Sequence, residues 1–360
     1  MTAQTQDVDR VSLGSHDTAY LLGLLNPMIV IAGNLMGGIW VLSGVLFMLG
    51  LGPILDHLLG CSSKADRKSS RSRDLDWILY LHSCLHFAVL GTLIYRSLVS
   101  ELHWTTLGAA LSTGLSSAVS GIVVAHELGH RRKGSVAWWL GRFNLLTVFY
   151  LHFTTEHNHT HHRFVATERD PATASAQESV YRFVCRTLPG QFLDAIRVHS
   201  RKGRRGFKNP ILQGVGLSLM IVALLVGVGG IAVAAACCMQ ALFAIFLLEY
   251  INYIRHYGLL RNEHESISSV HAWQSEARWS RWTLLELSRH ADHHLHASKP
   301  FWELRPYEDS PVLPSGYYGC FWIAVIPPLW RRVMKTRVPA TDREVSPPDL
   351  NESVSGHEVG

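Results

Sequence analysis

Histidine is the residue type in this sequence that could do the most chemistry, because 21 of the 360 residues are histidine and ten of them fall in four short motifs. These motifs, called clusters below, hold two, four, one and three histidines in turn. They are His126-Glu-Leu-Gly-His130, Glu156-His-Asn-His-Thr-His-His162, Asn252-Tyr-Ile-Arg-His256-Tyr-Gly258 and His290-Ala-Asp-His-His294. Neutral imidazole suits iron, zinc and copper as a ligand. The clusters therefore predict a metal site.

The spacing inside the clusters predicts which imidazoles act together. Residues three or four apart share one face of an α-helix. A common direction is thus expected within three sets, namely His126 with His130, His157 with His161, and His290 with His293 and His294. Together the clusters hold more imidazoles than one metal accepts, and they suit two metals that each keep an open position.

Acidic residues near the clusters are candidates to orient these imidazoles. A ligating histidine usually donates its second N–H to a carboxylate or a carbonyl group. The acidic candidates are Glu127, Glu156, Asp170, Glu249 and Asp292. Histidines outside the clusters are expected to face lipid or to form ordinary hydrogen bonds, and they are His82, His86, His103, His199 and His264.

Two other classes of metalloprotein remain open at this stage. His-Glu-x-x-His is also the zinc-protease signature, in which the glutamate is the general base. That alternative needs one further ligand and leaves the remaining clustered histidines without a role. A membrane metal transporter should carry ionisable residues at mid-membrane, and the apolar stretches of this chain hold few of them.

Apolar stretches must position the clusters. The chain is 48% hydrophobic and 17% charged, whereas soluble domains are about 25% charged. A bilayer is crossed by about 20 apolar residues in a helix. We expect an all-α integral membrane protein with six transmembrane helices, two of them in a hairpin over residues 21–59 and one in each of four further stretches. These stretches are 75–98, 104–125, 209–229 and 231–251. Residues 311–334 are expected to lie at the membrane interface.

The loop charges predict an orientation. Lys and Arg accumulate in cytoplasmic loops, and residues 131–208 carry 14 Lys and Arg against 5 Asp and Glu. The termini and the histidine-rich site are therefore expected on the cytoplasmic side, in a bacterial inner membrane. We expect one membrane domain over residues 19–335, between disordered segments at 1–18 and 336–360. The six cysteines include no Cys-x-x-Cys pair, so the chain carries no iron–sulfur or rubredoxin-like site of its own.

The motifs resemble the histidine boxes of the AlkB-type alkane 1-monooxygenases, which belong to the wider membrane fatty acid desaturase/hydroxylase superfamily. The resemblance covers about residues 20–335. Its main motifs are HELGH, EHNHTHHRFVATERDPAT, NYIRHYGL and SRHADHHLH, and further matches are ESVYRFVCRTLPG, HAW and LPSGYYG. The combination of EHNxxHH, VAT..DPA and NYxxHYG is more similar to alkane monooxygenases than to xylene monooxygenases or acyl desaturases.

The resemblance implies a di-iron, non-haem monooxygenase without haem or flavin. It assigns the iron ligands to His126, His130, His157, His161, His162, His256, His290, His293 and His294, and only the resemblance points to His256. It implies that medium-chain alkanes are hydroxylated at the terminal methyl to 1-alkanols with O2. Met48 falls near the position that limits substrate chain length. Related outcomes remain open: xylene monooxygenase-like action on aromatic methyl groups, or desaturase-like or decarboxylase-like action on fatty acyl chains.

The resemblance also implies an external electron donor, which is rubredoxin supplied by an NADH-dependent flavin reductase. Such donors are acidic, and a basic surface would attract one. The candidate residues are Arg131, Arg132, Lys133, Arg201, Lys202, Arg204 and Arg205. Membrane topology alone would also make these loops basic. No recognition motif accompanies the charge, so nucleic acid is not expected as a partner.

Overall fold

The computed structural model describes residues 15–62 and 75–339, and within these ranges the chain is helical and contains no β-strand. The first half contains α1 (Ser15–Ala19), η1 (Tyr20–Leu24), α2 (Leu25–Met36), η2 (Gly38–Leu42), α3 (Ser43–Val45), η3 (Leu46–Leu51), α4 (Gly52–Leu58), α5 (Asp76–Ser100), α6 (Trp104–Ser116), η5 (Ser117–Val123), α7 (Val124–Gly129), α8 (Val136–Thr147), α9 (Phe153–Glu156), η6 (His157–His161) and α10 (His162–Phe164). The second half contains α11 (Val180–Arg201), η7 (Gly206–Lys208), α12 (Pro210–His256), η8 (Ser269–His271), α13 (Arg278–Thr283), α14 (His290–Leu295), η9 (Phe301–Glu303), α15 (Tyr317–Ala324) and α16 (Pro327–Met334).

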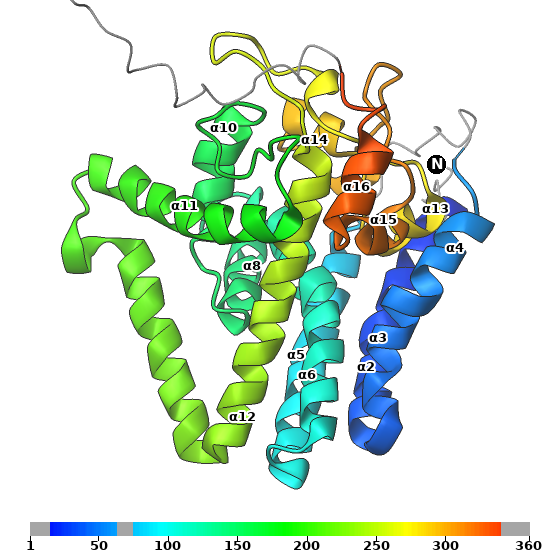
Figure 1. Cartoon of the computed structure of the whole chain (residues 1–360). Helices are drawn as coiled ribbons and strands as arrows, with labels where there is room; N and C mark the ends of the chain where they lie inside the picture. The colour runs from blue at the N-terminus through cyan, green and yellow to red at the C-terminus, as the bar shows by residue number, and fades with distance from the viewer. Residues whose placement is uncertain (1–14, 63–74, 340–360) are drawn as a thin grey trace, which may run out of the picture.

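Five helical stretches of the described chain are long and apolar enough to cross a membrane. They are Asp17–Met36, Gly38–Leu58, Asp76–Ser100, Trp104–Gly129 and Pro210–His256. The last stretch is α12, which consists of two arms that meet at Gly230 and form a V in Figure 1. Gly230 has a φ of 77°, a conformation that glycine adopts without steric cost. The chain is an all-helical integral membrane protein, as the sequence predicts, and the count of six spans stays a prediction.

The histidine clusters lie together at one end of this bundle (Figure 1). They occupy the end of α7, the segment from η6 to α10, the end of α12 and the short helix α14. The short turns at residues 37 and 230 lie at the opposite end. The folded chain therefore brings the four clusters to one side of the bundle. The cytoplasmic identity of that side stays a prediction.

Helix α8 is a mainly apolar helix within the basic segment 131–208. It is 12 residues long, and a helix of that length covers about 18 Å, which is too short for a bilayer. Thr147 at its end is 2.7 Å from His86 Nε2 of α5 and accepts, through its carbonyl group, a hydrogen bond from Gln240 of α12. α8 therefore packs against the spans.

The spans also carry polar contacts with one another. His82 Nδ1 lies 2.9 Å from Ser120 Oγ, and both side chains are fully buried. Asn34 Nδ2 donates to Thr113 at 3.3 Å and so joins α2 to α6. Hydrogen bonds of this kind hold helices together where lipid offers no partners. His82 and His86 are thus hydrogen-bonded inside the bundle and do not face lipid.

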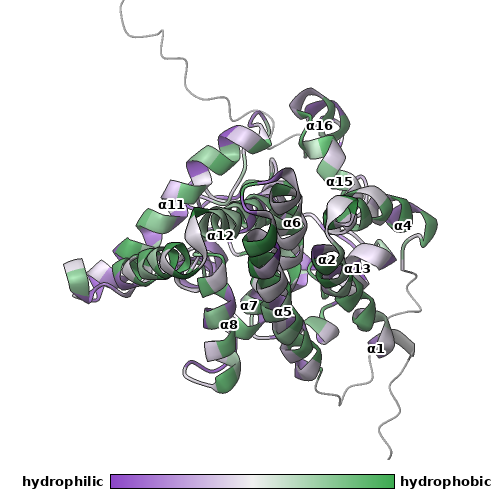
Figure 2. Cartoon of the chain, turned by 90° about the horizontal axis from the view of Figure 1, so that it is seen from below, coloured by the Kyte–Doolittle hydropathy of each residue, from purple (hydrophilic) through white to green (hydrophobic). Residues whose placement is uncertain are grey.

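Shorter helices cover the histidine-bearing end. α11 crosses the ends of the spans in Figure 1, and Figure 2 shows that it carries both polar and apolar residues. α15 and α16 contain eight residues each, which is too few to cross a bilayer. α1 begins at Ser15, inside the N-terminal segment expected to be disordered. The predictions for residues 1–14, 63–74 and 340–360 lie outside the described residues.

Candidate metal centre

Nine histidines of the described chain form two groups, in each of which the candidate ligand atoms lie within 4.8 Å of one another. Group A contains His126, His130, His157, His162 and His293. Group B contains His161, His256, His290 and His294. These are the same nine histidines that the sequence analysis names as ligands, and four separate stretches of the chain supply them.

The distances inside each group match imidazoles that share a metal. In group A, His162 Nε2 lies 3.0 Å from His157 Nε2 and 3.1 Å from His293 Nε2. In group B, His290 Nε2 lies 2.8 Å from His294 Nε2 and 3.2 Å from His256 Nε2. Metal–imidazole bonds are about 2.1 Å long, so two of them at a right angle place their nitrogens about 3.0 Å apart.

The segment from His157 to His162 departs from the predicted pairing. Regular α-helical spacing pairs His157 with His161, but η6 is a π-helical turn, in which hydrogen bonds join residues five apart. His157 therefore pairs with His162 in group A, and His161 belongs to group B. The two rings still lie close together and nearly parallel, with centroids 5.2 Å apart, but the wider turn places them in different groups.

Helix α14 also divides its histidines between the groups. His290 and His294 are four residues apart and meet in group B, as the spacing predicts. His293 lies in group A, where its Nε2 is 2.9 Å from His126 Nε2. The rings of His290 and His293 are nearly parallel, with centroids 5.5 Å apart, although they belong to different groups. One short helix contributes to both groups because it passes between them.

Burial keeps the imidazoles neutral. It lowers the pKa of His130 to about 4, with a smaller contribution from Arg131. Burial, followed by repulsion from neighbouring imidazoles, holds the pKa of His157 and of His293 well below its ordinary value. A neutral imidazole presents the lone pair that a metal requires. At neutral pH the groups are therefore ready to bind metal without first losing protons.

Asp170 orients one imidazole directly. Its Oδ2 lies 2.9 Å from His161 Nδ1, and the carboxylate also accepts hydrogen bonds from Ala172 N and Thr173 Oγ1. Asp170 is 1% exposed. A carboxylate in this position fixes the ring and directs the other nitrogen, His161 Nε2, towards the metal. This is the role that the sequence analysis expects of an acidic neighbour.

Arg255 is a polar neighbour that the sequence analysis does not predict. Its Nη1 lies 3.0 Å from His290 Nδ1, and its Nη2 donates to Asn252 Oδ1. The side chain is 2% exposed and points at group B from the residue before His256. Charge and spacing give no signal for it, because a cation is an unusual neighbour for metal ligands.

The remaining acidic candidates lie near the groups but contact other partners. Glu127 Oε1 is 3.6 Å from His126 Nδ1, which is too long for a hydrogen bond. Glu156 is 2% exposed, and its Oε1 has no partner among the described residues. Glu249 accepts hydrogen bonds from Tyr150 and Gln191.

Asp292 serves the segment that follows α14. It accepts hydrogen bonds from Lys299 Nζ and from the backbone N–H of Arg305, both at 2.6 Å. It contacts His296, which is outside the two groups, at 3.1 Å. Among the acidic candidates, only Asp170 bonds directly to one of the nine imidazoles.

A buried ion cluster supports the start of α14. Glu286 accepts two hydrogen bonds from Arg281, at 2.7 and 2.8 Å, and one from Tyr20. Arg289, the residue before His290, forms a double hydrogen bond with Glu276. Leu285 and Glu286 both have positive φ angles, which cost energy in residues other than glycine. The cluster holds this strained turn and so sets where α14 begins.

The residues present fit a pair of metal ions. His130 Nε2 and His161 Nε2 are buried and have no hydrogen-bond partner among the described residues. Buried polar atoms are normally paired, so these two nitrogens need a ligand. The seven other imidazoles of the two groups surround them, and Asp170 is the one acidic candidate that bonds to any of the nine. A metal in each group would satisfy the orphaned nitrogens and explain the short N···N distances.

Comparison with known proteins identifies the family. The family model described as fatty acid desaturase matches residues 102–324. Alkane 1-monooxygenase 1 of Pseudomonas aeruginosa is 36% identical over 323 residues, which are 84% of this chain and 84% of that protein. The chain belongs to the AlkB-type alkane 1-monooxygenase family, within the membrane fatty acid desaturase superfamily. It is a membrane monooxygenase.

Other relatives share similar identity. Alkane 1-monooxygenase of Ectopseudomonas oleovorans is 34% identical over 330 residues, covering 84% of this chain and 82% of that protein. The xylene/toluene monooxygenase hydroxylase component XylM of Pseudomonas putida is 32% identical over 313 residues, covering 83% of this chain and 82% of that protein. Membership of this family argues against the zinc-protease interpretation of the His-Glu-x-x-His motif, since the matching family model and the relatives named here are desaturase and monooxygenase ones.

In this AlkB-type chain, Met48 lies on η3 in the main apolar core and is 6% exposed. It does not face lipid. The same π-helical turn is held by Trp322, whose indole N–H donates to Leu49 O at 2.7 Å. π-Helical turns are frequent at functional sites.

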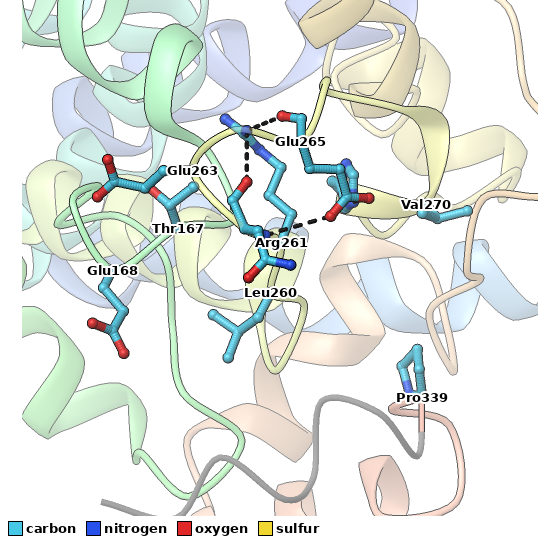
Figure 3. Close-up of a pocket in the computed structure, with 10 residues that line it drawn as sticks. Thr167, Glu168, Leu260, Arg261, Glu263, Glu265, Val270 and Pro339 are labelled. Carbon is cyan, nitrogen blue, oxygen red and sulfur yellow. Dashed lines mark hydrogen bonds and ion pairs between the residues drawn. The ribbon is translucent and has the colours of Figure 1, made fainter.

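The pocket in Figure 3 is separate from the two histidine groups. It encloses about 780 Å³ and is lined by Arg261, Glu265 and His271 among others. Arg261 donates to Val165 O at 2.8 Å and to Arg163 O at 3.0 Å. Arg261 therefore fastens the loop after α12 to the segment that follows the ligand-bearing turn η6.

Proposed function

We propose that the chain is a non-haem di-iron monooxygenase that hydroxylates the terminal methyl of medium-chain alkanes to 1-alkanols. The reaction consumes one alkane, one O2, two electrons and two protons, and it yields the alcohol and water. The observation that carries the proposal is the pair of histidine groups, with candidate ligand atoms within 4.8 Å in each. The alkane 1-monooxygenase relatives support the substrate class.

Iron is the proposed metal, with one ion in group A and one in group B. When bound, the irons would supply the redox chemistry that activates O2. The chain supplies nine imidazoles and a water-poor setting, since seven of the nine side chains are buried and His130 and His162 are half-buried. Asp170 orients His161, and Arg255 stands against His290.

The apolar core below the groups suits an alkane. Met48, Val119 and Ile122 belong to this core and come from η3 and η5. We propose that Met48 limits how far an alkane chain extends from the metal groups. Its burial supports this role, because a lipid-facing side chain could not meet a substrate inside the bundle.

Rubredoxin, reduced by an NADH-dependent flavin reductase, is the proposed electron donor. Arg132 and Lys133 are exposed and lie two and three residues after the half-buried proposed ligand His130. These two cations would attract an acidic donor to the edge of group A. The proposed location is the bacterial inner membrane, with the termini and the active site cytoplasmic, and the proposed domain spans residues 19–335.

The test is NADH-dependent conversion of octane to 1-octanol by the purified protein with added rubredoxin and reductase. His126→Ala and His290→Ala should abolish the reaction, whereas His264→Ala, which changes an exposed histidine outside the groups, should leave it intact. Parallel reactions with p-xylene and a fatty acid address the related outcomes, since XylM is also similar. One zinc and no iron per chain would refute the proposal.

A further inference from the structure

A basic turn joins α11 to α12. Residues 201–208 contain five cations and no acid, and every residue in the turn is exposed. The cations are Arg201, Lys202, Arg204, Arg205 and Lys208. None of them forms an ion pair within the part of the chain that the structure describes, whereas Arg186 and Arg197 of α11 pair with Glu178 and Asp194.

The basic turn is held in place by its neighbours. Asn209 is 1% exposed, accepts a hydrogen bond from Ile211 N at 3.0 Å and donates to Ile196 O at 3.1 Å. Gln213 donates to Phe207 O at 2.9 Å. The turn is thus fixed to the end of α11 and the start of α12, and its charged side chains project from a defined backbone.

Phe207 gives the basic turn an apolar element. Its side chain is 98% exposed, which has no structural benefit in water. It stands two residues before Asn209, which begins the apolar arm of α12. Aromatic residues at the end of a span commonly sit at the level of the lipid headgroups.

Helix α11 continues the same pattern. One face carries Tyr181, Cys185, Leu188, Phe192 and Ile196, at the three- and four-residue spacing of an amphipathic helix. The face with Arg186, Asp194 and Arg197 lines a pocket beside the segment after η6. In Figure 1 the helix crosses the ends of the spans. An amphipathic helix in this place lies in the plane of the membrane surface.

We propose that the basic turn, with α11, is a membrane-surface anchor that binds anionic phospholipid headgroups. Clusters of cations next to a span attract anionic lipids at the membrane surface. The unpaired cations offer the charge, and Phe207 reaches the level of the headgroups. This assignment removes Arg204 and Arg205 from the surface expected to receive the electron donor.

The location of the basic turn favours lipid over a donor protein. Figure 1 places it at the outer end of α11, away from α14, which contributes to both histidine groups. A donor must approach the metal groups, and Arg132 and Lys133 lie much nearer to them in sequence and follow the ligand His130. The two basic surfaces therefore have different partners.

The test compares two matched pairs of substitutions in the full-length protein in detergent. The first is Arg204→Gln with Arg205→Gln, and the control is Arg132→Gln with Lys133→Gln. Native mass spectrometry measures binding of dioctanoyl-phosphatidylglycerol and dioctanoyl-phosphatidylcholine to each. We expect the first pair to lower the preference for phosphatidylglycerol by about five-fold or more, and the control to leave it unchanged.

A second measurement distinguishes a lipid-binding role of the basic turn from a donor-binding role. The KM for rubredoxin, measured in detergent without added lipid, should be unchanged by the first pair. An unchanged lipid preference, or an equal loss in the control, would overturn the proposal. So would a raised KM for rubredoxin in the first pair with the lipid preference retained, since the basic turn would then be the donor site. Phe207→Ser should weaken the binding of both lipids to a similar extent, because the ring bears no charge and does not distinguish the two headgroups.

Discussion

His157 and His162 lie five residues apart in sequence, yet their Nε2 atoms are 3.0 Å apart. The π-helical turn η6 produces this contact, because it places residues five apart above one another. The same turn directs His161 to the other group. A regular α-helix would direct His157 and His161 together and leave group A without His162. The division of ligands between the groups therefore rests on one irregular turn.

Removing a ligand from one group should remove about one metal ion. His162→Ala should empty group A and His294→Ala should empty group B, because each loses an imidazole whose Nε2 contacts others of its group. Metal analysis after reconstitution with ferrous iron should fall from about two ions per chain to about one in each variant. His264→Ala is the control, and a single-ion loss in that variant would contradict the assignment.

Asp170→Asn should weaken group B while leaving the fold intact. Loss of a carboxylate that orients a ligand typically costs about 10- to 100-fold in metal affinity or activity, and Asp170 is the acid that bonds to His161. Competition with a chelator measures the iron affinity. Glu168→Gln, which changes an exposed carboxylate two residues earlier, should have no effect. Equal iron affinity in Asp170→Asn and wild type would remove Asp170 from this role.

Arg255→Leu should make the iron in group B harder to reduce. A cation near a metal stabilises the added electron by Coulomb attraction, and the Arg255 guanidinium stands 3.0 Å from His290 Nδ1. The reduction potential should therefore fall in Arg255→Leu and recover largely in Arg255→Lys. Potentiometric titration of the loaded protein measures it. A potential that rises in the leucine variant would show that Arg255 acts by geometry alone.

The size of residue 48 should set the longest alkane that reacts. Met48→Trp should exclude the longer substrates and Met48→Ala should admit them, because Met48 is buried in the core below the metal groups. Product analysis with alkanes from hexane to hexadecane gives the range. Leu46→Trp changes a residue of the same turn that is 63% exposed, and it should leave the range unaltered. An identical range for all variants would exclude Met48 from the substrate path.

Glu286→Gln should lower thermal stability at neutral pH and make it less sensitive to acid. Burial alone raises the pKa of Glu286, but Arg289 and Arg281 outweigh it and hold the pKa below the ordinary value. The stabilisation is thus complete above the unfolded pKa of about 4.3 and is lost as the pH falls through the lower folded value. Melting temperatures of metal-free protein should fall more steeply in wild type than in the variant as the pH drops below about 4.3, and the two proteins should respond alike above it.

Much of this arrangement follows from sequence because it depends on local rules. Hydropathy predicts apolar helices that are long enough to cross a membrane. Short spacing pairs His126 with His130 in one group and His290 with His294 in the other. The assignment of His157 and His161 to different groups is not visible in the sequence, because nothing in the residue pattern distinguishes a π-helical turn from an α-helical one. Arg255 also escapes prediction, since its role depends on a contact with His290, 35 residues away.

Helix α14 has a consequence for biogenesis. Among the elements that carry the nine grouped histidines it comes last along the chain, and it contributes to both groups. During synthesis neither group is complete until this helix has left the ribosome and folded back onto the spans that were inserted before it. Loading of the irons proposed above would therefore follow membrane insertion, since the unfinished chain holds neither group complete.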